Sequence, residues 1–240
     1  SKQLRAEVAQ RSAALLAKQI QADKDKINYF ASKGGKMRLV AKRMRDDVEE
    51  AEENKVDVRK EDRTIRPFTI ETQGEVPLEV LRITSYKVIK NHQPKEVECD
   101  LVLKRGSHLQ IIGPNGIGKT TLLESFASGH AKGEHVAPGV KIGYYRQDFS
   151  NLDFDKTVFE TLMDSMPKKI EEDMRSIAAG FLLYSDVMKN KVGNLSEGQK
   201  GLVAFAKLTM ERPGLLILDE PTNHINFRHL PIIAKALSNY

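Results

Sequence analysis

The chain has 240 residues, a single cysteine and a net charge of +5. This length can hold one full α/β domain and an extension, while one cysteine excludes an internal disulfide and fits a reducing, cytoplasmic compartment. No run approaches the roughly 18 apolar residues that span a bilayer, so we expect no transmembrane segment. Because Ser1 opens a helical-looking stretch without a signal pattern, we expect the chain to be a piece of a longer protein.

The whole positive excess lies in the first 66 residues. They carry 17 basic and 12 acidic residues, whereas residues 67–240 carry 21 of each. Nine basic residues and two aspartates fall within residues 18–45, and the stretch that follows is acidic. The positive charge is therefore concentrated in the middle of this N-terminal segment.

Apolar residues of the same segment recur at helical spacing. Met37, Val40, Met44 and Val48 step by three or four residues, and a rougher stripe precedes them. Between the two stripes lies Ser32-Lys-Gly-Gly-Lys36, and a glycine pair ends a helix and permits a reversal. We therefore predict a basic hairpin of two long antiparallel helices over residues 1–66 with its tip near residues 30–38, followed by a linker over residues 67–77.

Two interpretations of the basic tip stay open. Its lysines could merely keep a helical spacer soluble, which is the usual meaning of a charge run. Alternatively, they could neutralise nucleic-acid phosphates beside the aromatic residues Tyr29 and Phe30.

Beyond the linker, the pattern changes to strands and a phosphate-binding loop. Residues 78–83 and 96–103 alternate like antiparallel strands. Gly113-Pro-Asn-Gly-Ile-Gly-Lys-Thr120 has the spacing of a phosphate loop, between an expected buried strand at 109–112 and a helix from Thr121. Its backbone N–H groups and the helix dipole suit a phosphate chain, Lys119 would reach the β- and γ-phosphates, and the Thr120 hydroxyl would bind Mg²⁺.

The remaining elements alternate between strands and helices. Residues 140–145 read as a strand, residues 158–166 and 170–183 as helices of a small helical subdomain, and residues 198–210 as a helix. The apolar run 215–218 is typical of a buried parallel strand. Asp219 and Glu220 follow at its carboxyl end, where one carboxylate can hold Mg²⁺ through water and the other can polarise an attacking water.

Taken with Leu195-Ser-Glu-Gly-Gln199, these motifs resemble the ATP-binding-cassette (ABC) nucleotide-binding domain. The segment matches the family's signature motif, Gln147 falls at its Q-loop glutamine, and Pro221-Thr-Asn-His224 resembles the F subfamily of soluble, ribosome-associated tandem-cassette ATPases. The resemblance implies an α/β fold over residues 78–240, with a mixed sheet around the phosphate loop, an antiparallel β edge and a small helical subdomain, preceded by the long helical hairpin. The chain would then be the inter-cassette linker and the second cassette.

The resemblance also assigns roles to residues and names ATP and Mg²⁺ as ligands. Catalysis would use Glu220, Gln147 and Lys119, and Mg²⁺ would be bound by Thr120, Gln147 and Asp219. ATP would be bound by Gly113, Pro114, Asn115, Gly116, Ile117, Gly118, Lys119, Thr120 and Thr121, and the ATP of a second cassette by the signature residues Leu195, Ser196, Glu197, Gly198 and Gln199. The hairpin would face ribosomal RNA or tRNA, with Lys33, Lys36, Arg38, Lys42, Arg43 and Arg45 as contact candidates.

Several positions depart from the family pattern. Glu197 stands where glycine is usual, Leu202 where arginine is usual, and Asn226 where aspartate is usual. Tyr86 and His92 are weak candidates for the residue that stacks on adenine. The switch histidine would lie beyond Tyr240, so we expect the isolated chain to bind ATP with little turnover.

Three alternatives to an F-subfamily factor remain. The chain could be the nucleotide-binding subunit of an ABC membrane transporter, but the hairpin and the PTNH stretch argue against this. A DNA-repair or chromosome ATPase would interrupt the cassette with its coiled coil, whereas only about 75 residues separate Thr120 from Leu195. An adaptor that binds ATP without hydrolysing it is the third.

Overall fold

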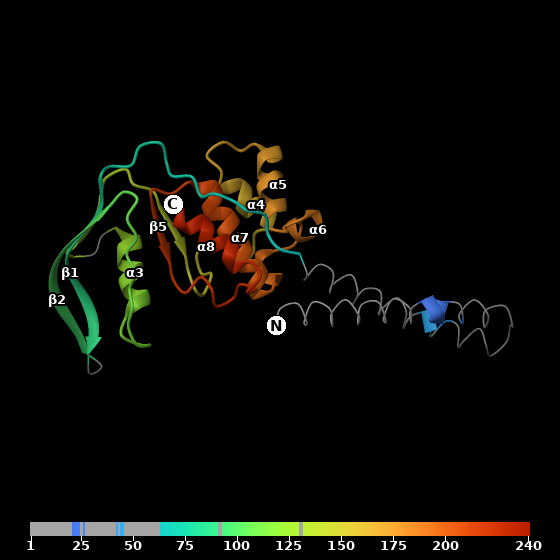
Figure 1. Cartoon of the computed structure of the whole chain (residues 1–240), viewed down its shortest axis with the longest axis horizontal. Helices are drawn as coiled ribbons and strands as arrows, with labels where there is room; N and C mark the ends of the chain where they lie inside the picture. Colours follow the sequence, from blue (N-terminus) through green and yellow to red (C-terminus); the bar gives the residue numbers. More distant parts are fainter. Residues whose placement is uncertain are drawn as a thin grey trace. The chain divides into compact units, whose positions relative to one another are not determined.

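The computed structural model describes residues 21–24, 26, 42, 44–45, 63–90, 93–129 and 132–240. The chain divides into two compact units, Ser1–Arg63 and Thr64–Tyr240 (Figure 1). In the first unit, the described residues at positions 21–24, 26, 42 and 44–45 are helical. The predicted hairpin turn, and the RNA-contact candidates Lys33, Lys36, Arg38 and Arg43, lie outside the described residues.

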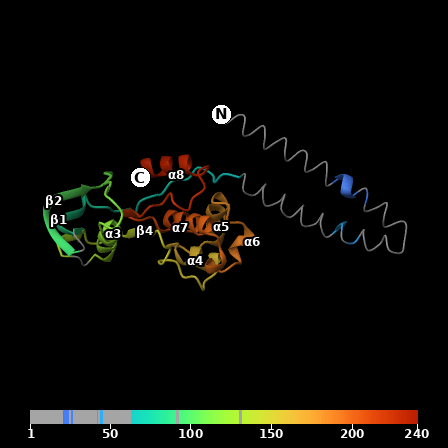
Figure 2. The ribbon, with the colours of Figure 1, turned by 90° about the horizontal axis from the view of Figure 1, so that it is seen from below.

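The second unit begins with an antiparallel sheet. Strands β1 (Glu79–Lys90) and β2 (Gln93–Lys104) pair along their length, and β3 (Glu134–Val136) pairs with the other edge of β1. This confirms the predicted antiparallel strands, which extend further than the alternation indicated. Helix α3 (Lys119–Ser128) lies beside this sheet in both ribbon views (Figure 2) and buries Phe126.

A second, parallel pair of strands carries the carboxylates. Strand β4 (Ile142–Tyr145) pairs in register with β5 (Leu215–Leu218). Alternate side chains of β5 pack into two different apolar clusters. Leu215 and Ile217 pack with β1 and α3, whereas Leu216 and Leu218 pack against the cluster built from the helices. The unbroken apolar run is therefore explained by burial on both faces.

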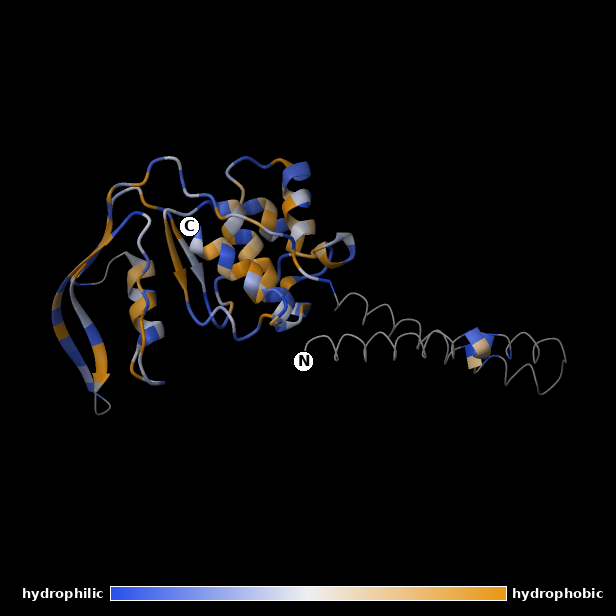
Figure 3. Cartoon of the chain, in the orientation of Figure 1, coloured by the Kyte–Doolittle hydropathy of each residue, from blue (hydrophilic) through white to orange (hydrophobic). Residues whose placement is uncertain are grey.

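Helices form the other half of the unit. They are α4 (Val158–Asp164), α5 (Glu171–Gly180), α6 (Ser185–Met188), the 3₁₀ turn η1 (Val192–Asn194), α7 (Glu197–Glu211) and α8 (Leu230–Ser238). Helix α7 is the most buried of them, and Leu202, Phe205, Ala206 and Met210 are all buried, as the spacing predicted. The hydropathy colouring of Figure 3 shows apolar residues along strand β5 and on part of α7.

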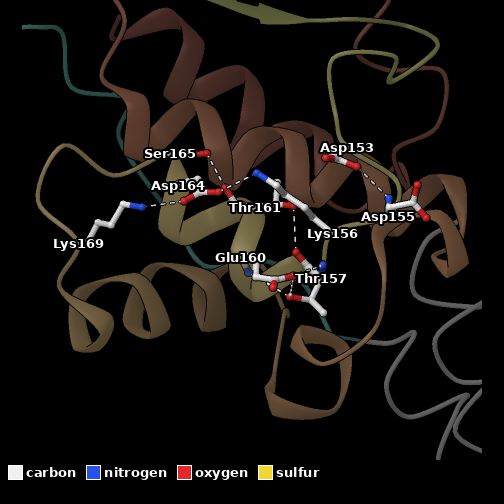
Figure 4. Close-up of polar contacts among 9 residues, drawn as sticks. All are labelled: Asp153, Asp155, Lys156, Thr157, Glu160, Thr161, Asp164, Ser165 and Lys169. Carbon is white, nitrogen blue, oxygen red and sulfur yellow. Dashed lines mark hydrogen bonds and ion pairs between the residues drawn. The ribbon is translucent and has the colours of Figure 1, made fainter.

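Polar contacts fix both ends of α4 (Figure 4). Thr157 and Glu160 form a reciprocal capping box at the start of the helix. At its end, Asp164 accepts ion pairs from Lys156 at 2.9 Å and from Lys169 at 2.7 Å. These two ammonium groups lower the pKa of Asp164 to about 2. The helical subdomain is thus held by local polar contacts as well as by its apolar cluster.

The segment that leads into the sheet is anchored on both sides. The Ile65 side chain is buried, and its N–H donates to Nδ1 of the buried His229 at 3.4 Å. The Arg66 N–H donates to the Gly180 carbonyl oxygen at 2.8 Å. Ile65 and Arg66 therefore join the end of α5 to the residue that precedes α8.

The prediction of a strand at residues 109–112 is wrong. These residues have no regular secondary structure, and Ile112 is 82% exposed. A strand needs a hydrogen-bonded neighbour, and none pairs with this segment among the described residues. Instead, Leu109 and Ile111 line a cavity of about 380 Å³ that residues of β5 also line.

Candidate nucleotide-binding site

The phosphate loop joins the antiparallel sheet to α3. Gly116 and Gly118 adopt φ values of 81° and 100°, a left-handed conformation that glycine tolerates without steric cost. Gly118 precedes the first residue of α3, and the Ile117 carbonyl accepts a hydrogen bond from the Ile89 N–H at 3.0 Å. The end of β1 therefore holds the loop at the amino end of α3, where backbone N–H groups and the helix dipole favour an anion.

Lys119 closes over this loop. Its ammonium donates to the Gly113 carbonyl at 2.8 Å and to the Pro114 carbonyl at 3.1 Å. Thr120 and Thr121 follow on the first turn of α3, and both are exposed. The cation and the two hydroxyl groups thus belong to one end of one helix.

The carboxylates lie at the carboxyl end of β5. Asp219 remains in the ladder, because its N–H donates to the Tyr145 carbonyl at 2.9 Å, and its side chain is buried. Its Oδ2 atom is buried without a hydrogen-bond partner among the described residues. Burial, together with the negative charge of Asp219, raises the pKa of the neighbouring Tyr144 to about 12.

One cavity connects the two halves of the site. Lys119, Asp219 and Glu220 all line the cavity of about 380 Å³. They come from α3 and from the end of β5, and Lys119 and Asp219 are 100 residues apart in sequence. A lysine and two carboxylate residues therefore line one cavity, which residues 113–118 of the phosphate loop do not line.

Gln147 is exposed just beyond β4. The preceding residue, Arg146, forms an ion pair with Glu124 of α3 and a second one with Asp148 at 3.3 Å. Its guanidinium also lies 5.2 Å from the centre of the Tyr144 ring. This ion pair fastens the segment that carries Gln147 to the helix that carries Lys119.

The oxygen donors in this region suit Mg²⁺. The unpartnered Oδ2 of Asp219, the Thr120 hydroxyl and the Gln147 amide oxygen are hard ligands of the kind that Mg²⁺ prefers. Among the residues that the structure describes, no three His, Cys, Asp or Glu side chains cluster as a metal site. The chain thus offers a few oxygen ligands and leaves the remaining positions to water and phosphate.

The signature residues begin α7. Ser196 and Gln199 form a reciprocal capping box, with the Gln199 N–H donating to Ser196 Oγ at 3.2 Å. Leu195 is buried, whereas Glu197 is exposed and Gln199 is half-buried. His224 Nδ1 lies 2.9 Å from Glu197 Oε2, so the unusual glutamate of the signature contacts the loop after β5.

Sequence reasoning missed two residues of this loop. Asn223 donates from its side-chain amide to Glu220 Oε2 at 2.5 Å, and His224 packs on Phe149, with ring centres 5.5 Å apart. Both lie in the PTNH stretch, whose sequence resembles that of the F subfamily but does not predict these contacts. Neither contact has a periodic or spacing signal that could have revealed it.

Other predicted contacts are only partly described. Tyr86 lines a cavity of about 440 Å³ that Ile117, Gly118 and Lys119 also line. His92, the other candidate for adenine stacking, lies outside the described residues. Of the RNA-contact candidates, Lys42 and Arg45 are described, and both are helical and exposed.

Comparison with known proteins gives the family. The sequence model of ABC transporters matches residues 97–223, more than half of the chain. The chain is 34% identical over 166 residues to the ATP-binding protein YdiF of Bacillus subtilis, covering 68% of this chain and 26% of that protein. It is also 34% identical over 138 residues to ATP-binding cassette sub-family F member 3 of Homo sapiens, covering 56% of this chain and 20% of that protein.

A solved structure agrees with the sequence comparisons. An ABC transporter ATP-binding protein from Pyrococcus furiosus aligns with a TM-score of 0.52 and 25% identity, over 66% of this chain and 86% of the other. The chain spans about a quarter of the length of the curated relatives it matches. No helix in the described part of the chain has the length and hydropathy of a membrane span. The chain belongs to the ATP-binding-cassette family, and its cassette is of the F-subfamily type.

Proposed function

We propose that this chain is the second cassette, with its preceding arm, of a ribosome-associated ABC-F ATPase that binds and hydrolyses ATP·Mg²⁺. The observation that carries the proposal is that Lys119 of the phosphate loop lines the same cavity as Asp219 and Glu220. A cation for the phosphates and two carboxylates for metal and water are what phosphoryl transfer to water requires.

The roles follow from the chemistry of each side chain. Residues 113–121 cradle the triphosphate with backbone N–H groups, and Lys119 neutralises the β- and γ-phosphates. Mg²⁺ would be held by Thr120, Gln147 and Asp219 and would neutralise charge that develops on the phosphate oxygens. Glu220 would then orient the attacking water and accept its proton.

The signature would act on a second nucleotide. In a head-to-tail pair of cassettes, Ser196 and Gly198 at the start of α7 would face the γ-phosphate bound by the partner cassette, where the positive end of the helix dipole favours an anion. ATP binding would therefore close the pair, and hydrolysis would open it. For this reason we expect the isolated 240 residues to bind ATP but to hydrolyse it more slowly than about 1 per second, the low end of kinase-type phosphoryl transfer.

The arm supplies the proposed link to the ribosome. The excess of basic residues in positions 1–66 would neutralise phosphates of ribosomal RNA or tRNA, and cassette closure would reposition the arm. Curated relatives named as F family members favour this function over a membrane-transporter subunit.

The test is co-sedimentation of the full-length Glu220→Gln protein with ribosomes. This variant retains the phosphate loop but lacks the proposed base, so ATP should trap the closed state and increase the ribosome-bound fraction. Lys119→Ala is the matched control, because it should abolish the ATP effect without changing the arm. Equal sedimentation of Glu220→Gln with and without ATP would count against the proposed function.

A further inference from the structure

The conformation of Glu220 requires support from its surroundings. Glu220 has a φ of 46°, in the left-handed region, whereas Asp219 still pairs with β4 through its N–H. A residue with a side chain in this region costs roughly 1–2 kcal/mol relative to the right-handed conformation. The chain thus leaves the sheet at Glu220 itself, and contacts elsewhere must hold it there.

Asn223 supplies two such contacts. Its N–H donates to the Glu220 carbonyl at 3.2 Å, which closes a tight turn over residues 220–223. Its side-chain amide donates to Glu220 Oε2 at 2.5 Å, so the same residue holds both the backbone and the carboxylate. The first contact fixes the turn and the second fixes where the carboxylate points.

The chemical nature of the side chain at position 223 affects the ability of Glu220 to act as a base. An amide N–H binds one oxygen of an ionised carboxylate without adding charge, and it leaves Oε1 to accept a proton from water. An aspartate at this position would lack the donor and would place a second negative charge beside the first. A hydrogen bond to one oxygen therefore orients Glu220 without using up its capacity to act as a base.

Neighbouring contacts hold the loop independently of this amide. Ile225 is buried, and its N–H donates to the Thr222 carbonyl at 3.4 Å. His224 contacts Glu197 at the start of α7 and the ring of Phe149. Removal of the Asn223 amide should therefore leave the loop folded and free only the carboxylate of Glu220.

We propose that Asn223 is a positioning residue that orients the Glu220 carboxylate toward the attacking water through the bond from Nδ2 to Oε2. The inference rests on the proposed function, because it presumes that Glu220 acts as the base of ATP hydrolysis. A misplacement of about 1 Å in a reacting group can cost a hundredfold in rate. The amide should thus affect the chemical step and leave ATP binding unchanged.

The test is steady-state ATP hydrolysis by the full-length protein, with kcat and KM measured separately. Asn223→Ala should lower kcat about tenfold to a hundredfold with KM for ATP within twofold of wild type. Asn223→Asp should lower kcat further, since it adds a repelling charge. Thr222→Ala is the matched control, because Thr222 is exposed one residue away and should keep the wild-type kcat.

Measurements in the Glu220→Gln variant distinguish a positioning role of Asn223 from a merely structural role. In Glu220→Gln, the proposed base is already absent, so adding Asn223→Ala should lower kcat no further. An equal loss in both backgrounds, or a kcat within twofold of wild type for both position-223 variants, would overturn the inference.

The two proposals can fail separately. If wild type and Glu220→Gln hydrolyse ATP at the same rate, both the proposed function and this inference are wrong. If Glu220→Gln is inactive while Asn223→Ala retains full kcat, only the role of Asn223 is wrong. Circular dichroism melts of each variant establish that every protein assayed is folded, and Asn223→Ser provides a second, smaller change for the same measurement.

Discussion

His224 Nδ1 lies 2.9 Å from Glu197 Oε2, which joins the start of helix α7 to the loop after strand β5. The same imidazole ring also contacts the ring of Phe149, two residues beyond Gln147, with the ring centres 5.5 Å apart. One side chain of the loop that carries the proposed base thus contacts both the signature and the segment that follows the Q-loop glutamine. The contact gives the unusual glutamate of the signature a defined partner.

The Glu197–His224 contact should contribute little free energy by itself. Glu197 is 71% exposed, and exposed pairs of this kind are worth about 0.2–1 kcal/mol. His224→Ala should lower the free energy of unfolding more than Glu197→Ala does, because it also removes the contact with Phe149. Urea denaturation of both single variants and the double variant measures the coupling, and a coupling well above about 1 kcal/mol would contradict this expectation.

A side chain at Gly201 should force its buried neighbours to move. A Cβ atom there would lie 2.6 Å from Ile225 Cδ1, closer than carbon atoms pack, and 3.0 Å from Tyr145 Oη, so the ends of these two side chains would have to shift. Gly201→Ala should therefore lower the free energy of unfolding by about 1–3 kcal/mol. Gly180→Ala is the matched control, since its Cβ would meet no atom nearer than 4.0 Å, and its stability should stay within about 0.5 kcal/mol of wild type or rise. Equal stability of the two variants would show that α7 and the loop do not pack as described.

His229 should make the cassette less stable in mild acid. Burial, and secondarily the charge of Arg228, lowers the pKa of His229 below its usual value. The unfolded chain therefore binds a proton more readily than the folded one, so stability is full above roughly pH 6.5 and falls as pH drops from there through the folded pKa. The protonated ring would also no longer accept the Ile65 N–H at Nδ1.

Thermal unfolding at pH 7.5 and 5.5 tests this prediction. His229→Gln cannot take up the proton but offers an oxygen to the Ile65 N–H. The difference in Tm between the two pH values should thus be smaller for His229→Gln than for wild type. If the difference in Tm between the two pH values is the same for His229→Gln and wild type, other titratable groups cause the acid sensitivity.

The sequence predicts the helices and strands whose hydrophobic pattern lies within one short segment. The helical spacing of apolar residues predicts α7, and the apolar run predicts β5, because each element buries side chains that are close together in the sequence. The strand expected at residues 109–112 was wrong, since an apolar run does not specify which strand it will pair with. The contacts of Asn223 with Glu220 and of His229 with Ile65 depend on a left-handed residue and on a tertiary contact across 164 positions, and neither leaves a signal in the order of residues.

Binding of Mg·ATP to the 240-residue chain and to its Lys119→Ala variant, measured by isothermal titration calorimetry, tests the nucleotide site most directly. The wild-type chain should bind one ATP with a Kd between about 1 μM and 1 mM, the range that KM values of enzymes usually span. Lys119→Ala should weaken binding at least tenfold, because it removes the cation from the phosphate loop, whereas Lys95→Ala on the exposed strand β2 should bind as wild type does. Equal affinity of wild type and Lys119→Ala for Mg·ATP would contradict the assignment of residues 113–121 as the phosphate-binding loop.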